Sequence, residues 1–442
     1  MAAMKHSFSG TANNLLRAPI AALRGVRSLV DLFDMPRSLR SVRHALGPLA
    51  TVFRAALSYT VALLAASMLI GGCSTVGGWF GSSPAASKPA ELVEFKPTLE
   101  VARAWEARLG SAQPYVFSPA SDGQTVLVAD RQGRLARIEL TSGRELWRLE
   151  TGKPFSGGVG VGEGLALLGT AKGELLAYSL KNGQAAWSLA LGGELLAPPE
   201  ASHGWVAARG NDGKVHLVDA RDGKLRWSQA RVLPPLLLRE QGHLLLTRQG
   251  LLVGHPGGRL STLALANGAP IWEVNVAVPR GSTELERIAD VVGPLAADAL
   301  HVCAVAYQGR IGCFDLGTGR PAWTREFSGL AGVELHAGVL YAVDDRGGVH
   351  AFDKQRGNHL WKQDRLRDRQ VSTPLALGRH LAVGDYQGFI HFLDAETGAF
   401  VARVATDGSA IRSPMLALSG GLVAQTANGG VYAFRIHEGA TK

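Results

Sequence analysis

Short apolar runs, bounded by glycines and turn-forming polar residues, follow one another from about residue 100 to the C-terminal end of the chain. In Gly213-KVHLVDARDG, Val215 and Leu217 alternate with residues of the opposite face, which is the two-residue period of a β-strand. Glycines at both ends suit hairpin turns because glycine reaches positive φ without steric cost. The pattern predicts an all-β fold of short strands joined by turns.

One sequence pattern repeats along this region: a glycine, nine residues, a second glycine, three residues and a tryptophan. The six complete copies, given by their two glycines and tryptophan, are Gly133, Gly143, Trp147; Gly173, Gly183, Trp187; Gly213, Gly223, Trp227; Gly258, Gly268, Trp272; Gly309, Gly319, Trp323; and Gly347, Gly357, Trp361. The two later copies, which lack the tryptophan, are Gly388, Gly398 and Gly429, Gly439. Successive first glycines lie 38 to 51 residues apart, the length of one four-stranded propeller blade. We therefore predict an eight-bladed β-propeller of four-stranded antiparallel blades over residues 99–442.

The tryptophans indicate how the ring closes. Trp105 precedes the first copy, whereas the last copy ends with almost no chain left. We expect the N-terminal strand around Trp105 to pair with the C-terminal strands and complete the last blade, because closure removes free strand edges. A large ring at a fixed place in each blade can fill the wedge between neighbours. We therefore interpret as core residues, and not as a ligand cage, Trp105, Trp147, Trp187, Trp227, Trp272, Trp323 and Trp361.

Two further features of the repeats concern turns and cysteines. An aspartate four residues before the second glycine can accept backbone N–H bonds of the turn, as expected for Asp219, Asp315, Asp353 and Asp394. Cys303 and Cys313 lie on two strands joined by the turn near Gly309. Two interpretations remain open, a cross-strand disulfide, which secretion permits, and two buried free thiols.

The net charge of +9 is concentrated before the repeats. Residues 1–72 hold eight of the 46 Lys and Arg and two of the 37 Asp and Glu, which leaves 38 basic and 35 acidic residues in the remainder. The body of the chain is therefore nearly balanced and has no basic stripe of the kind that phosphate backbones select. We expect no nucleic-acid partner.

An apolar run at residues 55–72 follows Arg37, Arg40, Arg43 and Arg54, which is the order of a secretion signal. The run ends in Ile70-Gly71-Gly72-Cys73, which resembles the lipobox of bacterial lipoproteins. In that family a lipid is attached to the cysteine and the leader is cut just before it. This resemblance implies a leader over residues 1–72, with Met35 as an alternative start, a lipid on Cys73, and a flexible Gly, Ser, Ala and Pro-rich tether over residues 73–98. An ordinary signal peptide or an uncleaved membrane helix is the alternative.

The repeat style, clearest in Cys313-FDLGTGRPAW and Leu393-DAETG, resembles the quinoprotein-type propeller. Quinone-dependent dehydrogenases share this style with BamB, a lipoprotein of the outer-membrane β-barrel assembly machinery. The chain has no adjacent cysteine pair and little length beyond eight ordinary blades, which argues against a dehydrogenase. Two segments outside the repeat, Leu233-PPLLLRE and Val278-PRGSTELERIADVVGPL, resemble characteristic segments of the BamB family.

The resemblance to BamB implies a partner and the residues that contact it. In that family the leucines and arginine of the first segment, with an aspartate of the second, contact the periplasmic domains of the barrel-inserting subunit BamA. The match carries over to Leu236, Leu238, Arg239 and Asp290, whereas the family's second acidic position is Val292 here. Two alternatives remain open: residues 236–238 as an inner strand of a blade, with Leu237 pointing inward, and Asp290 as the cap of a short helix over residues 284–289.

No motif of an enzyme is present. Gly158-VGVGEG is not a proper phosphate-binding loop, the thirteen histidines show no metal-ligand spacing, and no nucleophile and base stand out. The absence of these motifs predicts a non-catalytic protein with no cofactor and no metal. The resemblance to BamB implies a scaffold that is lipid-anchored at the periplasmic face of the outer membrane. It would bind BamA, and unfolded β-barrel substrates are a second expected ligand. The alternatives are a quinone-dependent periplasmic dehydrogenase and a generic protein-binding propeller of the cell envelope.

Overall fold

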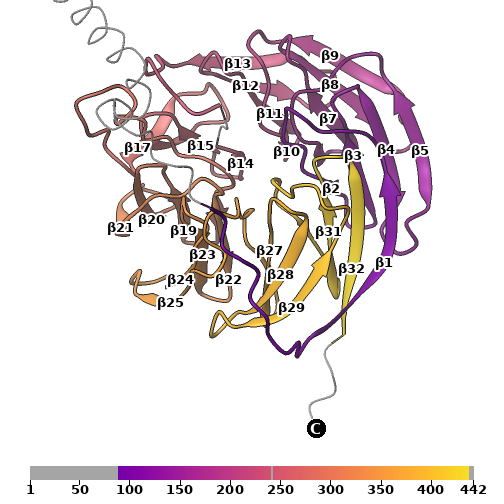
Figure 1. Cartoon of the computed structure of the whole chain (residues 1–442). Helices are drawn as coiled ribbons and strands as arrows, with labels where there is room; N and C mark the ends of the chain where they lie inside the picture. The colour runs from indigo at the N-terminus through magenta and orange to yellow at the C-terminus, as the bar shows by residue number, and fades with distance from the viewer. Residues whose placement is uncertain (1–87, 240–241, 438–442) are drawn as a thin grey trace, which may run out of the picture. The chain divides into compact units, whose positions relative to one another are not determined.

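The structure of the chain is a computed structural model that describes residues 88–239 and 242–437. These residues form eight four-stranded antiparallel sheets arranged in a ring, with no helix among them (Figure 1). The predicted eight-bladed propeller is therefore confirmed. The blades are numbered in chain order, and in each the strands run from the ring axis outward.

The strands of blades 1 to 4 are β2 (Ala120–Ser121), β3 (Thr125–Ala129), β4 (Arg134–Glu139) and β5 (Glu145–Glu150); β6 (Gly160–Gly162), β7 (Leu165–Gly169), β8 (Glu174–Ser179) and β9 (Ala185–Ala190); β10 (Glu200–Ser202), β11 (Trp205–Arg209), β12 (Lys214–Asp219) and β13 (Leu225–Ala230); and β14 (Leu244–Leu246), β15 (Leu251–His255), β16 (Arg259–Leu263) and β17 (Pro270–Asn275).

The strands of blades 5 to 8 are β18 (Ala296–Ala297), β19 (His301–Val305), β20 (Gly309–Asp315) and β21 (Pro321–Phe327); β22 (Val333–His336), β23 (Val339–Val343), β24 (Val349–Asp353) and β25 (His359–Gln363); β26 (Leu375–Leu377), β27 (His380–Gly384), β28 (Phe389–Asp394) and β29 (Phe400–Ala405); and β30 (Leu416–Leu418), β31 (Gly421–Gln425), β32 (Gly430–His437) and β1 (Glu100–Arg108).

Burial along each blade follows from stacking blade against blade. The second strand is buried on both faces, as in β3, whose five residues TVLVA are all buried. The outermost strand alternates instead, because one side of it meets solvent, as in β5. Each hydrophobic cluster joins two neighbouring blades; Val126 and Val128 of blade 1, for example, pack with Val423 and Val431 of blade 8. The core is therefore a ring of interfaces between blades.

The ring closes through the first strand. β1 pairs antiparallel with β32, from Glu100 opposite His437 to Arg108 opposite Gly430, with a bulge between Arg103 and Trp105. In Figure 1 the indigo N-terminal strand lies beside the yellow C-terminal one. The predicted closure is confirmed.

All seven tryptophans join neighbouring blades, as predicted. Each indole Nε1–H donates a hydrogen bond to a backbone carbonyl of the next blade, at 2.6–3.0 Å. The acceptors, in chain order, are Leu140, Leu180, Ala220, Leu265, Leu316, Lys354 and Ala395. At six of the seven junctions the second glycine of the next repeat packs against the same ring, and at the seventh Gly183 packs against Leu149. Gly319, for example, has φ +71°, and a Cβ there would stand 2.6 Å from Trp272. We call this pairing of indole, carbonyl and glycine the clasp.

The junction between blades 7 and 8 has no clasp, because Ala402 stands where the tryptophan would be. Residues 88–99, which we call the strap, lie along blade 7 instead. The backbone N–H groups of Thr98 and Leu99 donate to Val401 O, and Phe95 stacks on Phe400 with ring centroids 5.5 Å apart. The structure thus places residues 88–98, which the sequence assigns to the tether, against the propeller.

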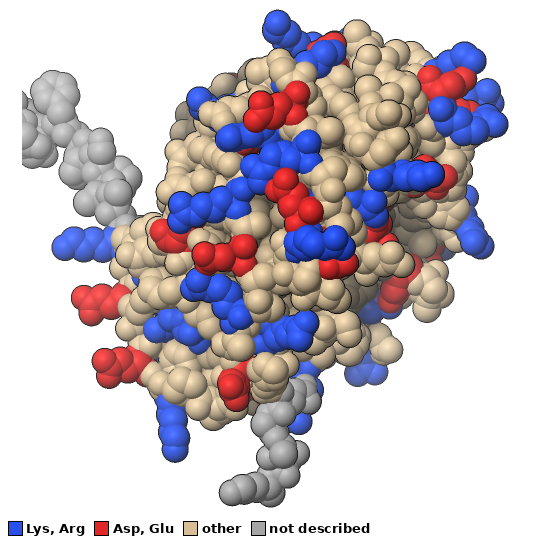
Figure 2. All heavy atoms as spheres, turned by 90° about the vertical axis from the view of Figure 1, so that its right-hand side faces the viewer, with Lys and Arg blue, Asp and Glu red and all other residues tan. Residues whose placement is uncertain are grey.

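Charges on the outer surface are mixed. Figure 2 shows Lys and Arg side chains interspersed with Asp and Glu over the side of the ring that faces the viewer. Many of these charges are paired locally, such as Arg148 with Glu145 at 2.6 Å and Arg137 with Asp122 at 2.7 Å. No stripe of a single sign crosses the surface in this view.

Candidate functional site

The candidate site lies on one face of the ring. Because successive strands alternate in direction, every connection from an outermost strand to the innermost strand of the next blade lies on the same face, which we call the loop face. Two connections there are long and adjacent in space. The first contains residues 231–239, which we call the docking loop, and the second, residues 276–295, we call the insertion loop.

Backbone pairing ties the two connections together near the ring axis. Gly242 and Gly293 form a parallel bridge, and the N–H of His243 donates to Gly293 O at 2.9 Å. The insertion loop is tied in turn to blade 5, where Val291 bridges Ala306. The two segments that the sequence singled out are therefore brought together on adjacent blades.

Asp290 holds the docking loop from beneath. It is only 3% exposed, and its Oδ2 accepts a hydrogen bond from the N–H of Leu238 at 2.7 Å. Its Oδ1 accepts from the N–H of Gly257 at 3.0 Å. The charge of Asp290 acts on the buried Arg209: burial lowers the pKa of Arg209 to about 10, and the charge of Asp290 opposes that shift. Asp290 is thus placed to position the loop.

Arg239 is the charged end of the docking loop. Its guanidinium lies 5.1 Å from the ring centroid of Tyr115 and pairs with Glu194 at 3.0 Å. The side chain is still 57% exposed. A guanidinium that is held in place and left open to solvent is suited to bidentate recognition of a carboxylate.

Apolar side chains are exposed on both loops. Leu236 is 46% exposed and Val232 is 94% exposed on the docking loop, and Val278 and Leu285 are 57% and 66% exposed on the insertion loop. Leu238, in contrast, is half-buried. Exposed apolar residues gathered beside an arginine are typical of a protein-binding surface.

Both structural alternatives for these residues are wrong. Residues 236–238 form no strand, and the inner strand of blade 4 begins only at Leu244. Residues 284–287 form a turn and not a helix. The carboxylate of Glu286 closes this turn by accepting hydrogen bonds from the N–H groups of Ser282 and Thr283. Val292, which replaces the family's second acidic residue, is 1% exposed and belongs to the core.

The docking loop ends at a pocket on the ring axis. The pocket has a volume of about 260 Å³ and is lined by residues from the connections that lead into all eight blades, Arg239 and Tyr115 among them. No local sequence pattern predicts this pocket, because its lining comes from eight different repeats.

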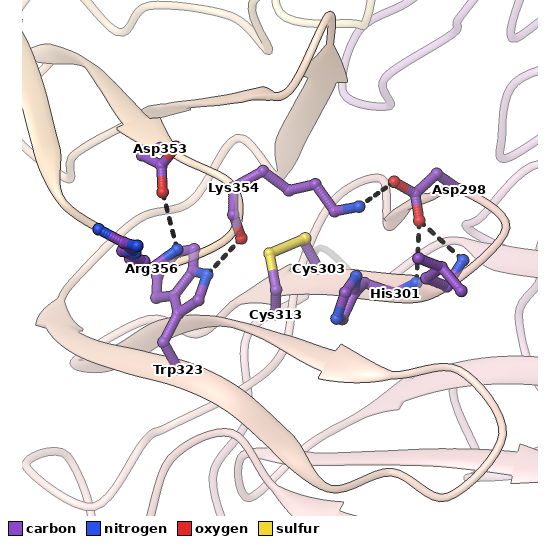
Figure 3. Close-up of a disulfide and its surroundings, with 9 residues drawn as sticks. Asp298, His301, Cys303, Cys313, Trp323, Asp353, Lys354 and Arg356 are labelled. Carbon is purple, nitrogen blue, oxygen red and sulfur yellow. Dashed lines mark hydrogen bonds and ion pairs between the residues drawn. A yellow bond between two sulfur atoms is a disulfide. The ribbon is translucent and has the colours of Figure 1, made fainter.

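Cys303 and Cys313 form a disulfide, which settles the alternative that the sequence left open. They face each other in register on β19 and β20, and both are fully buried. Figure 3 shows the disulfide close to Trp323, whose indole N–H bonds to Lys354 O of blade 6. Lys354 also pairs with Asp298 across the same junction. The disulfide therefore stabilises blade 5, away from the docking loop.

The aspartates of the repeat turns act as predicted. Asp315 Oδ1 accepts from the N–H of Thr318 at 2.8 Å, and Asp219, Asp353 and Asp394 accept equivalent bonds.

Cys73, the leader and residues 73–87 of the tether lie outside the described residues. Within residues 88–239 and 242–437 no helix is long and apolar enough to cross a membrane, and no group of three His, Cys, Asp or Glu side chains is placed to hold a metal ion.

Comparison with known proteins identifies the family. The profile of the family described as outer membrane protein assembly factor BamB matches residues 131–363. The outer membrane protein assembly factor BamB of Burkholderia pseudomallei is 38% identical over 376 residues, which cover 85% of this chain and 97% of the relative. That of Bordetella pertussis is 35% identical, covering 84% of this chain and 96% of the relative. The chain belongs to the BamB family.

Solved structures agree with membership of the BamB family. BamB from Moraxella catarrhalis superimposes with a TM-score of 0.70 at 27% identity, covering 76% of this chain and all of that one. Quinohemoprotein alcohol dehydrogenase from Comamonas testosteroni has a TM-score of 0.62 at 13% identity, which is a likeness of fold alone. The function of the chain is that of an outer membrane protein assembly factor, and the dehydrogenase alternative is not favoured.

Proposed function

We propose that the chain is a non-catalytic scaffold that docks through its loop face on the periplasmic domains of the barrel-inserting subunit BamA. The observation that carries this proposal is the exposure of Leu236 and Arg239 on a loop that is held rigidly from beneath by Asp290. A loop fixed before binding loses little conformational entropy when a partner covers it. Apolar anchors beside an arginine supply the type of contact that dominates interface energy.

The insertion loop extends the same surface in this proposal. Val278 and Leu285 offer further exposed apolar area on the insertion loop, which Asp290 joins to the docking loop. Because Asp290 and the Gly242–Gly293 bridge join the loops, a partner that covers one will lie against the other. Asp290 then contributes by positioning Leu238 and its neighbours.

The experiment is a pull-down of the lipidated chain from gentle detergent, with BamA measured in the eluate. Leu236→Ala combined with Arg239→Ala should reduce the recovered BamA at least tenfold. The matched control is Leu225→Ala combined with Arg226→Ala, which removes the same residue types from the exposed outer strand β13, where Leu225 is 49% exposed. Equal loss in both variants, or no loss in either, would contradict the docking proposal.

We also propose that the chain is anchored by a lipid on Cys73 to the periplasmic face of the outer membrane. The lipobox-like Ile70-Gly71-Gly72-Cys73 after an apolar run supports this, and several acyl chains on one residue give stable anchoring. Cells fed labelled palmitate should label the wild-type protein and leave Cys73→Ala unlabelled. A labelled Cys73→Ala protein would place the lipid elsewhere.

A further inference from the structure

The pocket on the ring axis has a composition that points to a ligand of its own. Its lining is contributed by one to four residues from each connection that leads into a blade, among them Tyr115, Pro198, Arg239, Pro294, Leu330 and Arg412. The prolines offer no N–H, and the hydroxyls of Ser156 and Thr373 are already bonded to backbone carbonyls. Most of the wall is therefore apolar and rigid.

The charge of the pocket is positive. Two arginines line it, and no Asp or Glu is among its lining residues. Arg239 is paired with Glu194, whereas Arg412 is exposed and makes no hydrogen bond or ion pair within the described part of the chain. His243 adds no charge at neutral pH, because burial lowers its pKa to about 4. One unpaired guanidinium thus faces an apolar wall.

We propose that this pocket binds a carboxylate that stands next to an apolar side chain. The guanidinium of Arg412 receives the carboxylate, and Tyr115 and Leu330 receive the apolar group. A single free positive charge matches a carboxylate better than a phosphate dianion, whose stronger hydration makes burial against apolar walls costly. At about 260 Å³ the pocket is near the lower end of small-ligand sites, and it therefore takes one or two residues of a chain.

The carboxylate has two possible sources, an acidic side chain in a peptide loop or the end of a polypeptide. Both present the same chemistry to Arg412. The residues assigned to the ligand, Arg412, Tyr115 and Leu330, lie outside the docking loop, and Arg239 of that loop lines the same pocket. Four short peptides separate the sources.

The experiment is calorimetric titration of the full chain with these peptides. One pair is acetylated, amidated Gly-Phe-Asp-Gly and its Asn counterpart; the other is acetylated Gly-Phe with a free carboxylate and its amide. We expect at least one carboxylate to bind about tenfold or more tightly than its neutral counterpart, because a charge-assisted hydrogen bond contributes that much. The pair that shows the difference identifies the source.

Variants test the assigned residue. Arg412→Gln should weaken binding of the preferred peptide about tenfold, and Arg226→Gln, an exposed arginine outside the pocket, should leave it unchanged. The proposal would be overturned by equal affinity for the carboxylate and amide peptides, or by an Arg412→Gln variant that binds the preferred peptide as tightly as wild type. Binding of inorganic phosphate in place of the peptides would overturn it as well. Arg412→Gln should still recover BamA in the pull-down, so failure of the pocket and failure of the docking proposal give different results.

Discussion

The carboxylate of Asp290 accepts the backbone N–H of Leu238 at 2.7 Å across 52 residues of sequence. This bond joins the insertion loop to the docking loop and fixes the direction in which the docking loop leaves the ring. The same carboxylate is the neighbouring countercharge of the buried Arg209. One buried side chain therefore serves both the stability of blades 3 to 5 and the shape of the candidate site.

Replacing Asp290 should affect stability and binding together. Asp290→Ala leaves Arg209 buried without its partner charge, and we expect a loss of about 3 kcal/mol in the free energy of unfolding, measured with urea. Asp290→Asn keeps an acceptor for the N–H of Leu238 and should lose less of the free energy of unfolding than Asp290→Ala. Hydrogen exchange at the Leu238 amide should accelerate in both variants. An Asp290→Ala protein of wild-type stability with a protected Leu238 amide would show that this contact is unimportant.

The clasp predicts that substitutions at one junction between blades will lower the free energy of unfolding by different amounts. Trp272→Phe retains a large ring but loses the bond to Leu316 O, and should cost about 1–2 kcal/mol. Trp272→Ala empties a core position and should cost about 3–5 kcal/mol. Gly319→Ala should also destabilise, since its φ is +71° and its Cβ would collide with Trp272. Urea unfolding of the three variants tests the order; a Trp272→Ala variant no less stable than Trp272→Phe would contradict it.

The strap should act as part of the ring. Leu99 is 6% exposed in the cluster between blades 7 and 8, so Leu99→Ala should cost about 2–4 kcal/mol. Phe95→Ala removes the stacking on Phe400 and the cation–π contact with Arg403, and should cost about 1–2 kcal/mol. Glu94→Ala, an exposed neighbour, is the control and should stay within about 0.5 kcal/mol of wild type. If all three variants match wild type, the strap contributes nothing to closure.

Acid should weaken the fold through buried histidines. Burial, together with the charges of nearby arginines, lowers the pKa of His255 from 6.5 to about 2. Below pH 6.5 the unfolded chain therefore binds a proton that the folded chain does not, and stability falls as the pH falls. From pH 6.5 to pH 5 this one group should cost about 2 kcal/mol.

Comparing wild type with His255→Gln isolates this effect. The variant should lose about 2 kcal/mol less between pH 6.5 and pH 5, measured by urea unfolding at each pH. Glu200 acts in the opposite direction in both proteins, because burial raises its pKa to about 7, and cancels in the comparison. Parallel pH profiles for the two proteins would show that His255 is not buried in a neutral form.

The architecture of the propeller follows from the amino-acid sequence alone. A repeat of about 40 residues sets the number of blades, and its glycines and aspartates set the turns, because these preferences act within a few residues. The place of the tryptophans between blades was predictable for the same reason, since six of the seven stand at a constant distance from their own glycines. The bond from each indole to the next blade was not predicted. Trp105 before the first copy was enough to predict closure.

Contacts between residues that are distant in the sequence became visible only in the folded chain. The family resemblance pointed to Asp290 as a residue that touches the partner, but the fold buries it beneath Leu238. The strap replaces the clasp at one junction because residues 88–99 return to blade 7, some 300 residues away along the chain. The axial pocket, with Arg239 and Arg412, exists only once eight blades close around an axis. Such features have no local pattern, because their energy comes from the packing of blades and not from the preferences of neighbouring residues.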